Sequence, residues 1–332
     1  MAHEISTVEF NGTRIVEAMY ANKPAWHKLG TVFSPDGTDA PDSETAMKLA
    51  HLDWRVELEP LFLANSADPV PGVFASVRQE PRTVLGTVGK RYSVHQNAEA
   101  FAFLDSLCQD GILRYESAMA LRGGQRIALL ARMPSVDTIA EGDDVLRYVL
   151  LTNAHDGSGA ITLTPTSVRV VCANTVRLAM DTNGSQSMSI RHTAGKNEKL
   201  ELAQQYISQF DAGFTLFRDT ARKLATSKLT MGQGAEYLRT LFPEPKEEDK
   251  RAHTNWVEKT DRIAALYKRG ERNTLPSIKG SWWAIFNAVT EFVDHETKFR
   301  GEFAADNRFE SLLSGPLADV KEKAWALAVQ MA

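Results

Sequence analysis

The chain has 332 residues, a mass of 36.8 kDa and a formal net charge of −4 at neutral pH. Hydrophobic residues make up 43% and charged residues 24%, as in an ordinary soluble globular protein large enough for two domains. The acidic balance excludes a chain whose overall field holds it on nucleic acid or on anionic lipid. A nucleic-acid site would therefore have to be a local basic patch.

The sequence carries no signal that would direct the chain out of the cytoplasm. Residues 1–12 have neither a basic segment nor an apolar one, so we expect no secretion signal. No stretch approaches about 18 uninterrupted apolar residues, which argues against a membrane-spanning helix. The two cysteines, Cys108 and Cys172, lie in apolar patterns of helical spacing. Buried free thiols in a reducing compartment are therefore the expectation.

Strand signals dominate the chain up to about residue 195. Residues 1–40 are rich in turn signals and contain Trp26 and His27, which are either part of a site or an anchor for an N-terminal arm. A short helix at 43–50 and a longer one at 97–108 keep helical spacing. Alternation of apolar and polar residues predicts strands at 54–60, 73–77, 82–88, 113–121, 125–131 and 187–192. The first three of these form a meander, and the paired glycines Gly123 and Gly124 form the turn between the strands at 113–121 and 125–131.

A central hairpin is predicted within residues 147–180. The apolar run 148–151 is a buried strand, 155–159 supplies two glycines for a tight turn, and 160–164 alternates as the returning strand. Pro165 is expected to close that strand. The spacing of apolar residues after it predicts a helix over 166–180, capped by Thr164 or Thr166.

Long amphipathic periods replace the strand signals after residue 195. They predict helices at 196–225, 234–242, 250–268, 282–295 and 317–331, with a charged, proline-bounded linker at 243–250. The predicted fold class is therefore α+β. A mixed, mostly antiparallel sheet domain with packed helices spans residues 1–195, and a helical domain spans residues 196–332.

Sequence templates for catalysis do not occur. The chain lacks a Walker-type loop, His-Glu-x-x-His, Cys-x-x-Cys and Gly-x-Ser-x-Gly, so catalytic residues stay unknown and no metal or cofactor is expected. His155 and Asp156 form the one pair on a turn. They could carry hydrolysis or bind a metal, but such residues more often bond their own backbone. Glu291, Asp294 and His295 at a helix end pose the same choice between metal binding and complementing the helix dipole.

Local positive charge is the stronger signal. Residues 78–132 hold eight Lys or Arg against five Asp or Glu, and residues 169–199 hold five against two. Aromatic residues are interleaved with them, and this combination suits single-stranded nucleic acid, because phosphate neutralisation and base stacking tolerate any sequence. A solvated strand face balanced by acids elsewhere is the alternative. The candidate nucleic-acid-binding residues are Lys90, Arg91, Tyr92, Arg122, Arg126 and Arg169.

Several short sequence motifs of this chain occur together in one known family. They are Trp26-His27-Lys28-Leu29-Gly30, Val88 to Tyr92 with Gln96-Asn97, Glu116-Ser117-Ala118 with Leu121 to Gly124, Arg169 to Thr175, and Ala284 to Glu291 with Asp294-His295. With these motifs the chain resembles the phage/plasmid-like proteins that carry a bacterial and phage domain of unknown function. The resemblance implies a gene of phages, plasmids or integrated elements acting in the cytoplasm of a bacterial host cell. It supplies no activity and no catalytic residues.

Three hypotheses of function follow. Mobile elements often carry single-strand annealing proteins, which form rings on a core of strands, hairpin and helix, and the predicted core is weakly similar to that plan. The first hypothesis is thus an accessory protein that binds single-stranded DNA, as an annealing or recombination factor and a homo-oligomer. The second is an enzyme of nucleic-acid or nucleotide metabolism using His155 and Asp156. The third is a host-interaction protein without catalysis.

Overall fold

A computed structural model describes most of the chain. The described residues are 7–10, 12–21, 31–34, 39–65, 67–109, 111–159, 161–169, 174–177, 188–190, 196–246, 248–301 and 304–332. Trp26, His27 and Cys172 lie outside these ranges, so the predictions made for them stay predictions.

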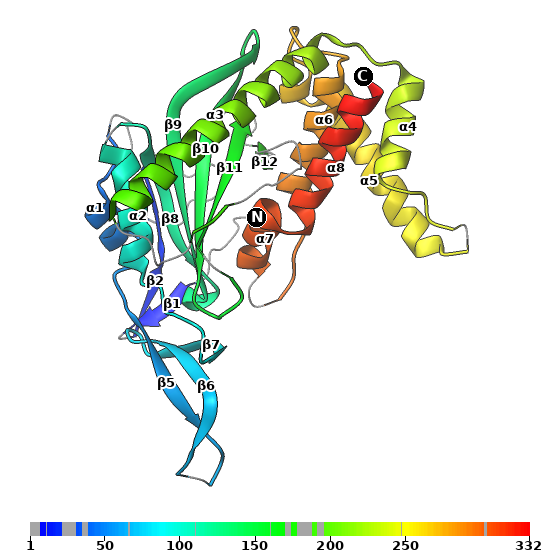
Figure 1. Ribbon diagram of the computed structural model, residues 1–332. Coiled ribbons are helices and arrows are strands. Elements are labelled where there is room, and N and C mark those ends of the chain that lie inside the picture. The colour runs from blue at the N-terminus through cyan, green and yellow to red at the C-terminus, as the bar shows by residue number, and fades with distance from the viewer. Residues whose placement is uncertain are drawn as a thin grey trace.

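A large, mostly antiparallel sheet forms the centre of the molecule (Figure 1). Eight strands belong to it among the described residues, in the order β12-β11-β10-β9-β8-β3-β4, with β13 also paired to β11. Among the strands that the structure describes, only β3 and β4 pair in parallel. The strands are β3 (Ala18–Tyr20), β4 (Thr31–Val32), β8 (Arg114–Leu121), β9 (Arg126–Ala140), β10 (Asp143–Ala154), β11 (Ile161–Arg169), β12 (Asn174–Arg177) and β13 (Met188–Ile190).

The predicted hairpin is confirmed, but the predicted helix after it is wrong. β10 and β11 pair from Val145 opposite Arg169 to Thr152 opposite Thr162. β11 therefore runs through Pro165 instead of ending there, and β12 follows at 174–177 where helix was expected. Pro165 is tolerated because β13 pairs with 161–163 and β12 with 166–169, so neither needs a donor from position 165.

A smaller sheet extends from one end of the large one. β5 (Val56–Phe62), β6 (Pro69–Arg78) and β7 (Thr83–Gly89) form the predicted meander, and β5 and β6 reach far beyond the main body in Figure 1. A separate hairpin, β1 (Thr7–Phe10) with β2 (Thr13–Val16), precedes β3. The turn-rich character of the first residues gave no sign of these strands.

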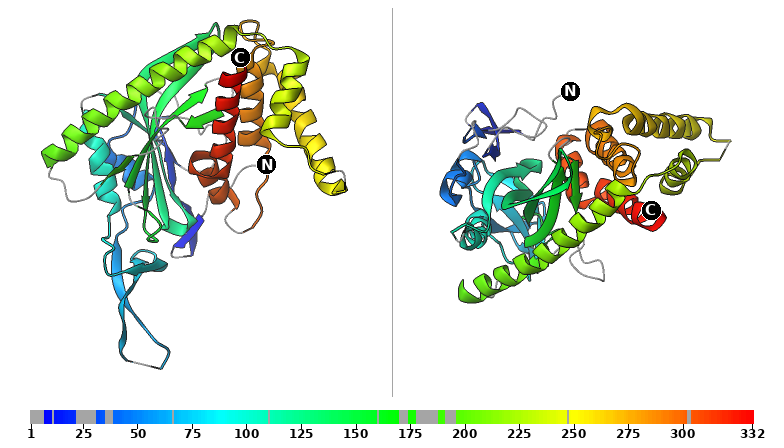
Figure 2. Two further views of the ribbon diagram at one scale, coloured as in Figure 1. Left: turned by 45° about the vertical axis from the view of Figure 1, so that its right-hand side comes forward. Right: turned by 90° about the horizontal axis from the view of Figure 1, so that it is seen from above.

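Helices cover one face of the large sheet. α1 (Ser43–Leu49), α2 (Asn97–Gln109) and α3 (Lys196–Thr226) pack there, and Figure 2 shows α3 running diagonally from α2 toward the C-terminal helices. Alternate residues of β8 to β10, such as Ala118, Leu129 and Val149, face this layer and join the main hydrophobic core. Their neighbours Met119 and Leu150 form a smaller cluster on the opposite face. This is the two-residue period of a strand.

The C-terminal helices lie beside the β12 edge of the sheet (Figure 2). They are α4 (Met231–Leu241), α5 (Lys250–Arg269), α6 (Trp282–Glu291), α7 (Ala304–Ser314) and α8 (Pro316–Met331), with a π-helical turn at Phe292–Glu296. α6 is buried along nearly its whole length because its residues are apolar on all sides. The indole nitrogen of Trp283 donates to Asp143 Oδ2 over 2.7 Å and so ties α6 to β10.

The predicted α+β class, with strands first and helices after, is confirmed. One hydrophobic cluster nevertheless contains Leu129 and Val149 of the sheet together with Phe217, Trp283 and Ala324 of the helices. Whether 1–195 and 196–332 are separate folding units stays a prediction. No helix in the described ranges has the length and apolar character that a membrane crossing requires.

Candidate functional site

Lys90, Arg91 and Tyr92 follow β7 at one end of the small sheet. Lys90 and Arg91 are exposed, and the Lys90 amide donates to the Gly72 carbonyl over 3.0 Å. The hydroxyl of Tyr92 donates to the Ala154 carbonyl over 3.2 Å, and burial raises the pKa of Tyr92 to about 12. The ring is therefore fixed against the end of β10 beside two cations that are open to solvent.

Arg122 and Arg126 lie at the β8–β9 turn and share one carboxylate of α7. The Arg122 guanidinium lies 2.6 Å from Glu310 Oε2 and donates to Asn307 Oδ1 over 2.9 Å, while Arg126 is 3.6 Å from Glu310 Oε1. The Arg122 amide also donates to Asp306 Oδ2 over 2.9 Å. Arg122 is thus committed to holding α7, whereas Arg126 is bound more loosely.

The β10–β11 turn lies between these two groups. Arg126 donates to Ser158 Oγ over 3.2 Å on one side, and Tyr92 is bonded to Ala154 on the other. β7 packs closely against the turn. Its Gly86 lies so near to Asp156 that a Cβ at this position would be 2.7 Å from the Asp156 carbonyl oxygen, too close for any side chain. The structure therefore places Tyr92 and Arg126 on two sides of one turn, and Lys90 and Arg91 directly precede Tyr92 in the chain.

Arg169 is not part of this group. It ends β11, eight residues beyond Ile161, which places its backbone about 26 Å from the turn by the rise of a strand. Its side chain lies outside what the structure describes. Of the six predicted residues, Tyr92 and Arg126 contact the turn, Lys90 and Arg91 precede Tyr92, Arg122 contacts α7, and Arg169 lies at the far end of the sheet.

His155 and Asp156 do not act as a pair. His155 is fully buried, and its Nε2 lies 2.8 Å from Asn97 Oδ1. Burial is the main cause that lowers the pKa of His155 to about 4, so the ring is neutral at physiological pH. Asp156 instead accepts from the Ser158 amide over 2.8 Å and shapes the turn. This geometry favours the structural interpretation of both residues.

The second candidate cluster is also structural. The Asp294 carboxylate pairs with buried Lys321 of α8 over 2.8 Å, and Glu291 accepts from Asn273 over 2.7 Å. Within the described residues, no three His, Cys, Asp or Glu side chains gather as metal ligands would.

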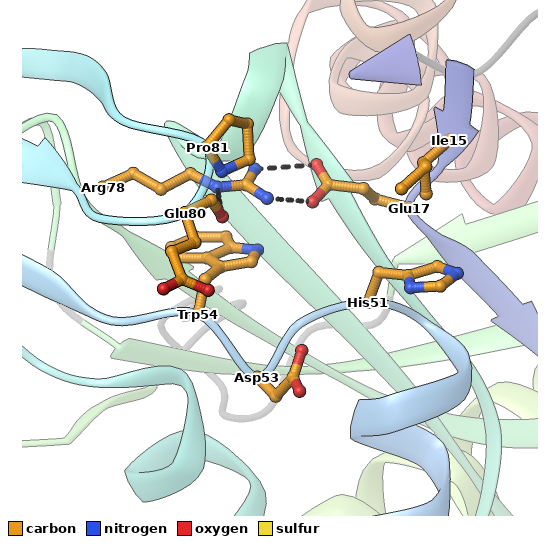
Figure 3. Close-up of a pocket in the computed structure, with 8 residues that line it drawn as sticks. All are labelled: Ile15, Glu17, His51, Asp53, Trp54, Arg78, Glu80 and Pro81. Carbon is orange, nitrogen blue, oxygen red and sulfur yellow. Dashed lines mark hydrogen bonds and ion pairs between the residues drawn. The ribbon is translucent and has the colours of Figure 1, made fainter. Parts of the chain in front are cut away.

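A pocket that the sequence did not predict lies close to the turn, where the small sheet meets the large one (Figure 3). Its cavity of about 240 Å³ is lined by Ile15, Glu17, His51, Asp53, Trp54, Arg78, Glu80 and Pro81. Ile15 belongs to β2, Glu17 directly precedes β3, and Arg78 ends β6. The other five come from the α1–β5 connection and the β6–β7 turn. Trp54 links the pocket to the turn, because its ring meets His155 edge to face at 5.3 Å between centroids.

Arg78 organises this pocket. Its guanidinium donates to both oxygens of Glu17, over 2.5 and 3.0 Å, and to the Glu80 carbonyl over 2.9 Å. It also lies 4.4 Å from the centroid of the Trp54 ring, a cation–π contact. Arg78 and Glu17 are both almost fully buried. Since every donor group of Arg78 has a protein partner, the arginine shapes the pocket and is not open to a ligand.

Unpaired polar atoms gather behind the pocket. Four buried side-chain atoms have no hydrogen-bond partner in the described structure: Trp54 Nε1, Ser76 Oγ, Asn153 Oδ1 and His155 Nδ1. Ser76 lies opposite Gly86 in the β6–β7 ladder. Its side chain is therefore on the face of the small sheet where Gly86 packs against Asp156 of the turn. Buried groups of this kind are usually satisfied by water or a ligand. The junction of the two sheets is therefore a polar part of the interior with buried groups that a water or a ligand could satisfy.

Comparison with known proteins gives a family and no function. No curated protein and no solved structure matches the chain. The family model described as "Domain of unknown function (DUF932)" matches residues 84–313. All six predicted nucleic-acid residues lie inside that range, whereas all eight residues that line the pocket precede it. Because the match covers more than half of the sequence, the chain belongs to the DUF932 family.

Proposed function

We propose that this protein binds single-stranded nucleic acid around the β10–β11 turn, as a cytoplasmic accessory protein of a bacterial mobile element. The observation that carries the proposal is the placement of Tyr92 and Arg126 on two sides of the turn at Gly157 to Gly159, with the exposed Lys90 and Arg91 directly before Tyr92 in the chain. The turn itself is exposed. The cations can neutralise phosphates and the aromatic ring can stack on a base. The glycines carry no side chain, so the nucleic-acid strand can approach the backbone of the turn closely.

The charge balance around the turn supports this surface. Lys90 and Arg91 form no ion pair within the described structure, and Arg126 shares Glu310 with Arg122. Asp156 is the acid closest to the turn, and its carboxylate accepts from the Ser158 amide. Lys90, Arg91 and Arg126 are therefore the cations that a phosphate chain would meet, and Arg122 would act only indirectly through α7.

A titration of labelled single-stranded DNA at a series of salt concentrations tests the proposal. Three phosphate contacts predict a slope of log affinity against log salt near −2, at roughly −0.7 per contact. Lys90→Ala and Arg91→Ala should each flatten the slope by about 0.7. Arg82→Ala is the matched control, because Arg82 lies on the same small sheet and is already paired with Glu59. Absence of salt-sensitive binding to DNA or RNA at micromolar protein would overturn the proposal.

The annealing form of the proposal requires more than binding. Annealing two strands needs several copies of the chain on one strand, as in a ring. Light scattering of the DNA complex should then show a mass of several protomers, and complementary strands should pair faster with the protein than without it. A monomeric complex that leaves the pairing rate unchanged would reduce the proposal to simple binding.

A host-interaction protein is the second candidate. Phe62 ends β5 and Leu63 follows it, at the turn end of the β5–β6 hairpin that projects from the body in Figure 1. Their exposed fractions are 53% and 67%. Exposed apolar side chains on a projecting hairpin are typical of a contact with another protein. Phe62→Ser with Leu63→Ser should abolish such an interaction and leave DNA binding unchanged.

A further inference from the structure

We infer that the Arg78 pocket, the eight-residue pocket of Figure 3, receives a single nucleobase, with guanine as the preferred base. This inference rests on the proposed binding of nucleic acid and names the part of the ligand that enters the protein. It follows from the size of the pocket, its charge and one unpaired donor.

The size fits one base. The cavity of about 240 Å³ equals roughly eight water volumes at about 30 Å³ each. That space accommodates a planar heterocycle, whereas a whole nucleotide with its sugar and phosphate needs more. Ile15 and Pro81 add apolar surface to the walls, which suits the faces of a ring.

The charge of the pocket excludes phosphate. Glu17 is neutralised by Arg78, so the remaining acids decide the local potential. Asp53 and Glu80 are exposed and form no ion pair within the described structure. Two free carboxylates repel a phosphate group but accept hydrogen bonds from N–H groups. The backbone of a bound strand would thus stay at the basic turn while an uncharged base enters the pocket.

The unpaired donor is Trp54. The residue is 6% exposed, and its Nε1–H has no partner. In Figure 3 the indole nitrogen points toward the space between Glu17, His51 and Asp53. A buried donor without an acceptor costs free energy, and a ligand oxygen or ring nitrogen that accepts from it removes that cost. Because the indole nitrogen is closed off from solvent, neighbouring side chains of the pocket must move for a ligand to reach it.

Guanine matches this arrangement best. Its pairing edge carries the O6 acceptor next to two N–H donors. The donors can meet one carboxylate side by side, as Asp53 would offer, while O6 accepts from Trp54. Adenine and cytosine offer the carboxylate a single amino group, and thymine a single ring N–H. The pocket also lies close to the basic turn, because the Trp54 ring contacts His155 at the end of β10. The same ring packs on Gly124 in the β8–β9 turn, where an added Cβ would be only 3.1 Å from it.

Titration with nucleosides at high salt tests the pocket separately from the phosphate contacts. We expect guanosine to bind, and inosine, which lacks the 2-amino group, to bind at least about tenfold more weakly, as the loss of one hydrogen bond to a charged group predicts. Asp53→Asn keeps the shape and removes the charge. Trp54→Phe keeps an aromatic ring against Arg78 but removes the N–H together with the second ring of the indole. Both variants should weaken guanosine binding at least about tenfold. Asp53→Asn should do so without lowering the melting temperature, whereas Trp54→Phe should also lower it because of the cavity left behind.

The outcomes separate this inference from the proposed function. Guanosine binding that both variants weaken, in a protein that fails to bind DNA, would support the pocket and overturn the proposed function. DNA binding with no guanosine binding, or guanosine binding that neither variant changes, would overturn the pocket alone. A preference for inosine or thymidine over guanosine would overturn it as well.

Discussion

Arg78 and Glu17, 61 residues apart in the chain, form a bidentate ion pair whose side chains are 4% and 3% exposed. The pair joins the last residue of β6 to the residue before β3, and so fixes the small sheet to the large one. Arg78 also reaches the Gly123 carbonyl at 3.5 Å. Three segments therefore meet at one guanidinium, which makes this pair the central support of the pocket.

Breaking the pair should destabilise the protein strongly. Glu17→Gln or Arg78→Met leaves one buried charge without its partner, at a cost of about 3–5 kcal/mol. The double variant should cost less than the sum, because no lone charge remains. Arg82→Ala removes the exposed pair with Glu59 and should cost under about 1 kcal/mol. Urea unfolding monitored by circular dichroism measures all four, and equal costs for Arg78→Met and Arg82→Ala would contradict the assigned burial.

His155 should make stability depend on pH. Its pKa is about 4 in the folded protein, mainly because burial disfavours the charged ring, against 6.5 for an ordinary histidine. Below pH about 6.5 the unfolded chain binds a proton that the folded chain does not, so stability falls until pH about 4. The loss is about 3 kcal/mol. His155→Gln should remove this contribution to the dependence of stability on pH, while the contribution of the carboxylates should remain. Identical pH profiles for the two proteins would show that the ring titrates normally.

Arg122 and Arg126 should differ in what they support. Arg122→Ala removes the contacts to Asn307 and Glu310 and should cost about 1 kcal/mol, with faster hydrogen exchange in α7. Arg126→Ala loses only the longer contact to Glu310 and the bond to Ser158, so stability should change little while DNA affinity falls. A loss of DNA affinity in Arg122→Ala with little change in stability would instead place Arg122 in the binding surface.

The helices and the sheet should unfold together. Trp283→Phe removes the hydrogen bond to buried Asp143 across the two regions and should cost about 1–3 kcal/mol. Because Leu129 and Val149 of the sheet share one hydrophobic cluster with Phe217 and Trp283 of the helices, a chain ending near residue 195 should lack native stability. Limited proteolysis should cut the connection at 243–249 before any site within 145–169. A stable, cooperatively folded fragment 1–195 would instead support two domains.

Local patterns predicted most of the fold. Alternation identified the meander, β8, β9 and the hairpin, and helical spacing identified α1 to α6 and α8 within a few residues. The failure after Pro165 has a physical cause. Val168, Val171 and Thr175 fit a helical period, but they are β-branched and belong to a segment rich in valine and threonine, which favours strands. Pairing with β10 then decided the outcome.

The candidate site was predictable only in part. Lys90 and Arg91 follow a strand signal with turn residues, so their exposure could be inferred, whereas the packing of Tyr92 against Ala154 could not. The ion pairs of Arg122 with α7 and of Arg78 with Glu17 join residues 188 and 61 positions apart, and no local pattern encodes such contacts. Trp54 likewise read as the start of a strand, and only the packing of two sheets makes it the wall of a pocket.

The most direct test of the proposed surface is hydrogen exchange with and without single-stranded DNA. Binding around the turn predicts slower exchange in residues 86–92, 122–127 and 154–159, with no change in α4 and α5. The protection should disappear in a Lys90→Ala, Arg91→Ala protein that keeps its melting temperature. DNA-dependent protection confined to α4 and α5, or none at saturating DNA, would contradict the account.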